Sequence, residues 1–293
     1  MFALSCAKFP PIDAKSRLEQ PATALVFGRS PNYLGIQTSL GNTFMTCEMS
    51  DTVEVIGATR PGRWVITCDH ASNHVPDDVA GGDLGLPAED MARHIAYDVG
   101  AAGVARALGE ALCAPVVLSR FSRLVIDPNR GEDDPTLLMQ VYDGSIIPAN
   151  RGVSNAELER RLNRFHRPYH AALSDIISAR DNPIVVSIHS FTAQLRGRDP
   201  RPWHVSVLYA GDTRLAYPLI ARLRDQPDLC VGDNEPYSGH LPDDSMDRHC
   251  VQPGRLHVLI EVRNNLIGNS EDQQAWGIRL AHLLDAAASS ADL

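Results

Sequence analysis

The sequence predicts an α/β fold: a single three-layer domain in which a mixed, mostly parallel sheet carries helices on both faces. The main observation is that short apolar runs alternate with helical stretches from Arg63 onward. Several of these runs are almost continuously apolar, as expected of strands that are covered on both faces. A chain of 293 residues with 44% hydrophobic and 22% charged residues is also long and apolar enough to bury one large core.

The individual elements follow from the same patterns. Strands are predicted from apolar runs at residues 64–68, 114–120, 123–127, 183–189, 204–210 and 257–263. Helices are predicted from apolar residues at helical spacing at about 88–112, 154–180, 213–225 and 271–288. Ser154 and Glu157 form a capping-box pattern, which marks the start of the second helix.

Residues 1–50 differ from the rest of the chain. They are rich in Pro, Ser, Gly and Thr and show no periodic apolar segment. We interpret them as an N-terminal extension, either disordered or packed as an arm, and residues 51–293 as the folded domain. Deleting residues 1–48 is therefore expected to leave folding and activity nearly intact.

Charge and cysteine usage limit the class of function. The net charge of −9 argues against a nucleic acid or an anionic membrane as the partner. Six scattered cysteines without a CxxC pair indicate neither a disulfide framework nor a structural zinc site. No apolar run approaches the roughly 18–20 residues that span a bilayer. A cytoplasmic protein is expected.

Polar side chains follow several predicted strands at the point where each strand ends. The chain reads Asp69-His70 after the first strand and His189-Ser190 after the fourth, and the last ends on Glu261-Val262-Arg263. A fourth group, Asp127-Pro128-Asn129-Arg130, follows the third. Because ligands bind at the carboxyl ends of strands in open α/β sheets, we expect these residues to converge.

Two of the converging residues, His70 and His189, are suitable zinc ligands. Glu261 is then available as the general base that deprotonates the attacking water. The third ligand is open. Asn73 stands where an HxxE pattern would place a ligand, and an amide binds zinc poorly. Asp98, four residues after His94 on the predicted helix, either completes the ligand set or lines the pocket with His94.

The arginines beside this site suggest capture of a carboxylate. Arg130 and Arg263 have the planar fork that suits such a group, although each also has a possible ion-pair partner nearby, Asp127 or Glu261. Tyr237, Arg248 and His249 stand in loops that could reach over the pocket or lie plainly on the surface.

Other catalytic arrangements are disfavoured. The sequence has no GxSxG elbow, no P-loop lysine and no GxGxxG after a strand. Cys68 precedes His70 but lies within an apolar strand, where burial is expected to keep the thiol protonated and inert.

An ordered series of motifs resembles the N-formylglutamate amidohydrolase family. The resemblance runs from about residue 63 to 285 and rests on CDHASNHVP (68–76), SRFSRLVIDPNR (119–130), RPYHAAL (167–173), SIHSF (187–191), NEPYSG (234–239) and HVLIEVRNNLI (257–267). It implies a zinc-exopeptidase-like fold, related in plan to carboxypeptidases and aspartoacylase. It also implies hydrolysis of N-formylglutamate to formate and glutamate, in the context of histidine breakdown.

The same resemblance implies residue roles. His70 and His189 would bind the metal, and Glu261 would be the base. Asn129 and Arg130 match an Asn-Arg pair that grips the substrate carboxylate, and Arg123 and Arg263 would be further contacts to anionic groups. Two alternative functions are a zinc carboxypeptidase-like peptidase acting on a small peptide, and a metal-free protein that binds an acidic metabolite.

Overall fold

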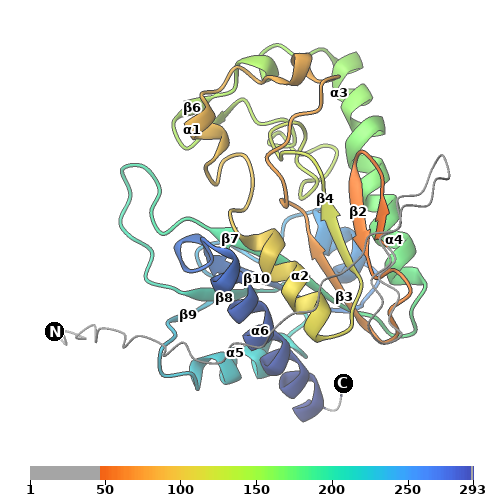
Figure 1. Ribbon diagram of the computed structural model, residues 1–293, viewed down its shortest axis with the longest axis vertical. Helices are drawn as coiled ribbons and strands as arrows, with labels where there is room; N and C mark the ends of the chain where they lie inside the picture. Colours follow the sequence, from red (N-terminus) through yellow and green to blue (C-terminus); the bar gives the residue numbers. More distant parts are fainter. Residues whose placement is uncertain (1–46, 292) are drawn as a thin grey trace, which may run out of the picture. The chain divides into compact units, whose positions relative to one another are not determined.

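The computed structural model describes residues 47–291 and 293 of the chain. Within these residues, eight strands form one sheet in the order β1-β2-β4-β3-β7-β10-β8-β9 (Figure 1). The strands are β1 (Cys47–Met49), β2 (Val53–Ile56), β3 (Trp64–Cys68), β4 (Val116–Ser119), β7 (Ile184–Phe191), β8 (Val205–Leu208), β9 (Val231–Asp233) and β10 (Leu256–Arg263). The central strands β4, β3, β7 and β10 are parallel, whereas β1, β2 and β8 pair antiparallel with their neighbours towards the centre. This confirms the predicted mixed, mostly parallel sheet.

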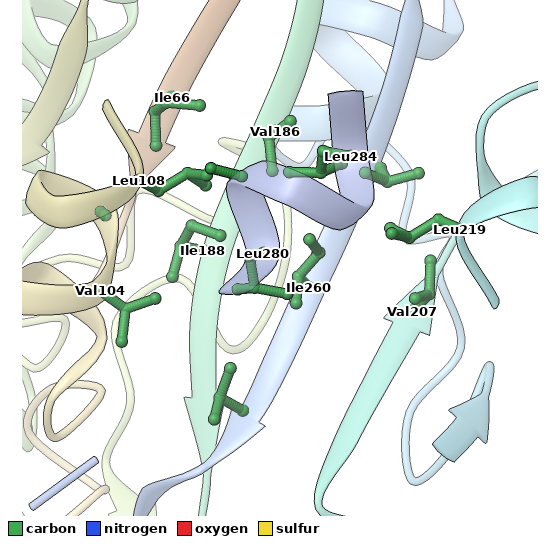
Figure 2. Packing of buried hydrophobic residues seen from close by; sticks show 14 of the residues in the cluster. Ile66, Val104, Leu108, Val186, Ile188, Val207, Leu219, Ile260, Leu280 and Leu284 are labelled. Atoms are coloured by element: carbon green, nitrogen blue, oxygen red, sulfur yellow. The ribbon is translucent and has the colours of Figure 1, made fainter. Parts of the chain in front are cut away.

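Helices cover both faces of the sheet, which confirms the three-layer prediction. On one face, α2 (Ala101–Ala111), α5 (Ala216–Arg224) and α6 (Ser270–Ser290) pack their apolar sides on the strands (Figure 2). The other face is covered by a continuous helical stretch of α3 (Asn155–Arg161), η3 (Leu162–His166) and α4 (Arg167–Ser178). Ser154 Oγ accepts a hydrogen bond from the Glu157 N–H and caps this stretch, as the sequence pattern predicted.

Shorter elements connect these layers. They are η1 (Ala80–Gly82), α1 (Ala88–Met91), the hairpin of β5 (Val141–Tyr142) and β6 (Ser145–Ile146), η2 (Pro148–Asn150), η4 (Asp247–Val251) and η5 (Asn264–Leu266). None of the helices in the described part of the chain is long and apolar enough to cross a membrane.

The order of the strands creates a place for a ligand. From β3 the chain passes through α2 to β4 on one side, and from β4 it returns through α3 and α4 to β7 on the other side of β3. The direction of winding therefore reverses between β3 and β7. Crevices outside the carboxyl ends of such strands are where open α/β sheets bind ligands.

The predicted helix at 88–112 is wrong in its middle. Only α1 and α2 are helical, and residues 92–100 form turns between them. Gly100 has a φ of 83°, which interrupts any continuous helix, and α2 begins after it. A side chain at this position would collide with the Ile267 carbonyl. The apolar residue Ile95 is fully buried from a turn, so its helical spacing was misleading.

The predicted strand at 123–127 is also wrong, although these residues are buried. Side chains, instead of a neighbouring strand, satisfy this backbone. Buried Arg161 donates to the Val125 carbonyl at 2.9 Å, and the Asn150 amide donates to the Leu124 carbonyl at 2.8 Å. An apolar run therefore becomes a buried loop, because distant polar side chains replace the strand hydrogen bonds.

The predicted extension at 1–50 lies mostly outside the described residues. Its last part does not: β1 is an edge strand that pairs with β2 from Cys47↔Ile56 to Met49↔Glu54. The domain therefore begins slightly before residue 51, and the proposed deletion of residues 1–48 would remove two of the three residues of this strand.

Three histidines are buried beside α4, and they form what we call the histidine cluster: His166, His170 and His249. The His166 and His170 ring centroids lie 4.4 Å apart, and His170 Nδ1 lies 2.9 Å from His249 Nε2. Burial lowers the pKa of each ring; for His249 it falls to about 4, with Arg248 and Arg255 adding to the effect. These rings are therefore neutral in the folded protein near pH 7.

The histidine cluster predicts a loss of stability in mild acid. In the unfolded chain a histidine has a pKa of about 6.5, so the unfolded state binds more protons below this pH. The contribution of His249 is complete above about pH 6.5 and decreases as the pH falls towards 4, by roughly 3 kcal/mol in total. Denaturant unfolding between pH 7.5 and 4.5 measures this slope.

The matched control is His282→Asn, at an exposed histidine on α6. His249→Asn should flatten the decrease in unfolding free energy, whereas His282→Asn should keep it. Equal slopes for all three proteins would show that His249 does not titrate in this pH range.

Candidate active site

A cavity of about 380 Å³ opens at the carboxyl edge of the sheet, at the reversal between β3 and β7. Eight of the nine residues predicted for the site line it: His70, Asp98, Arg123, Asn129, Arg130, His189, Tyr237 and Glu261. His94, the alternative pocket residue, lines it as well. The structure thus brings together residues that lie as much as 191 positions apart in the sequence.

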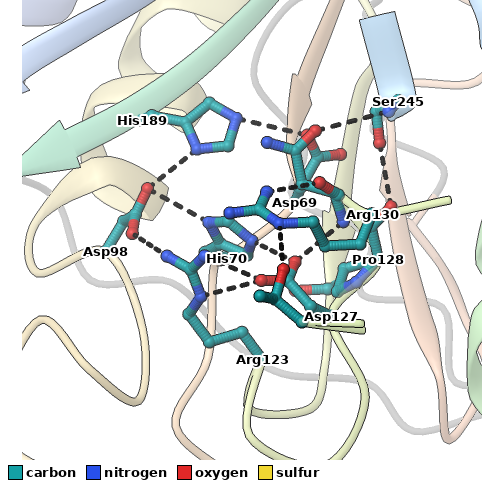
Figure 3. Close-up of polar contacts among 12 residues, drawn as sticks. Asp69, His70, Asp98, Arg123, Asp127, Pro128, Arg130, His189 and Ser245 are labelled. Carbon is teal, nitrogen blue, oxygen red and sulfur yellow. Dashed lines mark hydrogen bonds and ion pairs between the residues drawn. The ribbon is translucent and has the colours of Figure 1, made fainter. Parts of the chain in front are cut away.

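Two buried histidines and one buried carboxylate converge in the cavity. Asp98 Oδ2 lies 2.9 Å from His189 Nδ1 and 3.4 Å from His70 Nδ1 (Figure 3). Each of the three residues offers a ligand atom within 4.8 Å of the others. We call this group the His-Asp-His cluster. It matches the predicted ligand set, and metal binding by these residues remains a prediction.

Each histidine of the cluster is also held from behind by a carboxylate. His70 Nε2 lies 2.7 Å from Asp127 Oδ1, and His189 Nε2 lies 3.2 Å from Asp69 Oδ2. A carboxylate accepts hydrogen bonds, so Nε2 of each ring is placed to donate to the carboxylate behind it, while Nδ1 of each ring faces Asp98. Histidine ligands of metals are commonly oriented in this way by a carboxylate on the second nitrogen.

The electrostatics of the cluster agree with this arrangement. Burial alone would raise the pKa of the Asp98 carboxyl, but the two neighbouring histidines lower it by more. Its pKa therefore lies well below the usual range. The same balance holds for the pKa of Asp69, whose partners are His189, His70 and Tyr169. Both carboxylates therefore stay ionised at neutral pH, as a metal ligand and an orienting partner must.

The donor set fits a divalent metal ion of the zinc type. Two imidazole nitrogens and one carboxylate oxygen are three protein ligands, which leaves a fourth position for a reactant, as in catalytic zinc sites. The two Nδ1 atoms that would bind the ion are aimed at one point, and the carboxylates behind the rings fix their orientation.

Glu261 lies next to the cluster without belonging to it. Its Cα pairs with that of His189 across the parallel strands β10 and β7, so both side chains point to the same face of the sheet. Burial raises the pKa of Glu261 to about 7, with a further contribution from Asp98. Its Oε2 is buried and has no hydrogen-bond partner among the described residues. This carboxylate is free to exchange a proton with a molecule in the cavity.

The arginines of the cavity differ in their freedom. Arg123 donates two hydrogen bonds to Asp127 Oδ2, at 2.7 and 3.0 Å, and lies 3.7 Å from Asp98 (Figure 3). Arg130 is held through Nε by Thr136 Oγ1 and, at 4.0 Å, by Asp134, and through Nη1 by the Asn129 carbonyl. Within the described chain, its Nη2 donates no hydrogen bond to protein. Arg130 is thus the cation best placed to receive an anionic group.

The predicted role of Arg263 is wrong. Its guanidinium does not line the cavity, because it donates to the carbonyls of Arg201 and Pro202 and to Asn265 Oδ1.

Other residues considered from the sequence also lie outside the site. The Asn73 amide donates to the Met91 carbonyl, and the residue is exposed. Arg248 and His249 lie on η4 and line a different cavity. Burial raises the pKa of Cys68 well above its usual range, as expected for an inert thiol.

Several residues of the site have roles that were not predicted from the sequence, although Asp69 and Asp127 were expected at this edge of the sheet. Asp69 and Asp127 orient the histidines, and Tyr169 on α4 donates a 2.5 Å hydrogen bond to Asp69. Ser187 Oγ lies 3.0 Å from His189 Nε2. A usable signal existed for Ser187, since residues two apart on a strand share a face. The position of Asp127 depends on a buried loop that the sequence suggested to be a strand.

Asp127 is expected to strengthen metal binding through His70. Replacing Asp127 with asparagine removes the charge behind the ring and should weaken affinity for zinc by about 10–100-fold. The matched control is Asp143→Asn, which also breaks a carboxylate–arginine pair, with Arg93, but touches neither cluster histidine. Competition with a chelating dye measures both affinities. A similar loss in the two variants would show a general effect of charge.

The fold and the site are together those of a hydrolase of the amidohydrolase type. The chain belongs to the N-formylglutamate amidohydrolase family, since the model of that family matches residues 62–268, well over half of the sequence.

Solved structures agree with this assignment. A gene product from Agrobacterium tumefaciens is 36% identical, with a TM-score of 0.77 over 83% of this chain and 96% of that chain. An N-formylglutamate amidohydrolase from Ralstonia eutropha JMP134 is 22% identical, with a TM-score of 0.59 over 80% of this chain and 99% of that one. At this identity the second likeness shows the fold alone. No curated protein matches the chain.

Proposed function

We propose that the protein is a metal-dependent amidohydrolase that hydrolyses N-formyl-L-glutamate to formate and L-glutamate, or cleaves the amide bond of a closely similar N-acyl amino acid. The observation that carries this proposal is the pairing of the His-Asp-His cluster with Glu261. A set of groups suited to metal binding and a carboxylate oxygen without a hydrogen-bond partner among the described residues face one cavity. The family of the chain supplies the substrate class.

The size and charge of the cavity support a small anionic substrate. Its volume of about 380 Å³ lies near the lower end of the roughly 300–1,000 Å³ of small-molecule sites. Arg130 and Asn129 line one wall, and they would fix a substrate carboxylate with a guanidinium and an amide donor. The scissile amide would then extend towards His70 and His189.

The residues of the chain divide the chemistry. Zinc, held by His70, Asp98 and His189, would supply a Lewis acid that polarises the amide carbonyl and acidifies water. Glu261 would take a proton from the attacking water and pass it to the amide nitrogen as the C–N bond breaks, giving formate and glutamate. A base with a pKa near 7 suits both transfers, because it can hold or release a proton at neutral pH.

Substrate profiling of the zinc-loaded protein tests the proposal. N-formyl-L-glutamate should be hydrolysed with a higher kcat/KM than N-acetyl-L-glutamate or dipeptides that end in glutamate. Preference for a dipeptide would assign the site to a peptidase. Tight binding of these compounds by protein that takes up no metal and hydrolyses none of them would assign it to a binding protein.

Arg130 is expected to select for the substrate carboxylate. Hydrogen bonds to charged groups contribute about 1.5–3 kcal/mol, so Arg130→Ala should lower kcat/KM by roughly 10–150-fold. Arg130→Lys should rescue only partly, because lysine lacks the planar fork. The ratio of kcat/KM for the free carboxylate over its amide analogue measures the selection. If Arg130→Ala keeps the wild-type ratio, Arg123 becomes the better candidate.

A further inference from the structure

A second cavity lies between α4 and η4, and it shares no lining residue with the active site. Its volume is about 600 Å³. The polar side chains that line it are His170, Ser174, Arg248, His249, Gln252 and Arg255. We call it the α4–η4 pocket. The proposed function uses none of these residues.

The pocket is cationic in an acidic protein. Its two arginines carry the charge, its two histidines are neutral, and no aspartate or glutamate lines it, although the chain has a net charge of −9. Among the described residues, Arg248 has no carboxylate within ion-pair distance, and the guanidinium of Arg255 donates only to the His249 carbonyl. The nearby carboxylates are otherwise engaged, since Glu132 pairs with Arg167 and Asp247 accepts from Gln252.

The backbone around the pocket has a rare conformation. Both η3 and η4 are π-helical turns, and they carry His166 and His249 of the histidine cluster. Well under 1% of residues in globular proteins are π-helical, and such turns occur frequently at functional sites. Of the two, η4 lines the pocket through Arg248 and His249, whereas η3 reaches it only indirectly, through the contact of the His166 ring with His170.

The histidines of the pocket also have unused hydrogen-bonding capacity. His170 is 4% exposed, and its Nε2 is buried without a hydrogen-bond partner among the described residues, while Nδ1 contacts His249. A buried polar atom without a partner is uncommon and calls for an explanation. A bound ligand that accepts a hydrogen bond from this ring would provide one.

We propose that the α4–η4 pocket binds a small oxyanion: a phosphate ion, or the phosphate group of a small metabolite. Arg248 and Arg255 supply the planar forks that match phosphate oxygens, and His170 Nε2 supplies one ring N–H beside them when His249 Nε2 donates to His170 Nδ1. The absence of lining carboxylates among the described residues removes the repulsion that such a ligand would otherwise meet. This site is separate from the proposed hydrolytic chemistry and does not depend on it.

Isothermal titration of the full-length, zinc-loaded protein with inorganic phosphate, at constant ionic strength, tests this site. Wild type should show one saturable site that Arg248→Gln weakens about tenfold or more. Arg255→Gln should act in the same direction, and Arg248→Lys should rescue partly. The matched control is Arg63→Gln, at an arginine that lines another cavity and also has no carboxylate partner in the described structure.

Two further arms separate the alternatives. Glycerol 3-phosphate binding more tightly than inorganic phosphate would identify a phosphorylated metabolite as the ligand, whereas weaker binding would identify the free ion. The proposal is overturned if no saturable binding occurs, or if Arg63→Gln weakens it as much as Arg248→Gln. It is equally overturned if Arg130→Ala abolishes binding and Arg248→Gln does not, since phosphate would then occupy the active site.

Discussion

Replacing His189 with alanine is expected to remove the bound metal and nearly all hydrolytic activity. His189 Nδ1 lies 2.9 Å from Asp98 Oδ2, and the ring is fixed from the opposite side by Asp69. Without this ring, two protein ligands remain, and the charge of Asp98 loses a partner. His70→Ala should have the same effect, because its Nδ1 faces the same point. Elemental analysis of protein purified without chelator measures the metal, and N-formylglutamate hydrolysis measures the activity.

The matched control is His94→Ala. His94 lines the same cavity and lies close to Asp143, but it does not belong to the His-Asp-His cluster. The His94→Ala variant should therefore bind the metal at wild-type stoichiometry. If His70→Ala and His189→Ala both retain the metal, then the ion is bound elsewhere in the protein.

Replacing Glu261 with glutamine is expected to leave the metal in place and to lower kcat by about 10²–10⁴-fold. Glutamine keeps the size of the side chain but cannot take a proton from water. Glu261 is buried on β10, and its Oε2 has no hydrogen-bond partner in the described part of the chain that the substitution would remove. The measurement is kcat together with the zinc content of the same sample.

Asp244→Asn provides the comparison for this variant. Asp244 is a second buried carboxyl of the cavity, and burial raises its pKa to about 6. Its Oδ1 accepts the Asp247 N–H, a contact that asparagine preserves, so kcat should change only a few-fold. If Glu261→Gln loses its zinc as the histidine variants do, then Glu261 is a metal ligand and not the general base.

The central strands could be predicted because their signal is local. Strands buried on both faces are continuously apolar, and β3, β7 and β10 were located to within a few residues. The short strands β2, β5, β6 and β9 gave no comparable run. The loop at 123–127 imitated a strand, because its backbone partners, Arg161 and Asn150, come from distant parts of the chain.

The candidate site was predictable for a related reason. Parallel strands end at one edge, so His70, His189 and Glu261 had to converge once the strands were identified. Asp98 was selected through a predicted helix, but it lies in the non-helical segment between α1 and α2, where its N–H donates to the His70 carbonyl. The orienting roles of Asp69 and Asp127, and the contacts that hold Arg263 away from the cavity, depend on tertiary structure. No local sequence pattern indicates them.

Anomalous diffraction at the zinc edge, from crystals of the zinc-loaded protein, is the decisive measurement for the proposed metal site. One strong peak is expected about 2.0–2.2 Å from His70 Nδ1, His189 Nδ1 and an Asp98 oxygen. His70 Nε2 should remain hydrogen-bonded to Asp127 and His189 Nε2 to Asp69, and Glu261 should not bind the ion. A peak bound through either Nε2 atom, through Glu261, or at another part of the chain would contradict this assignment.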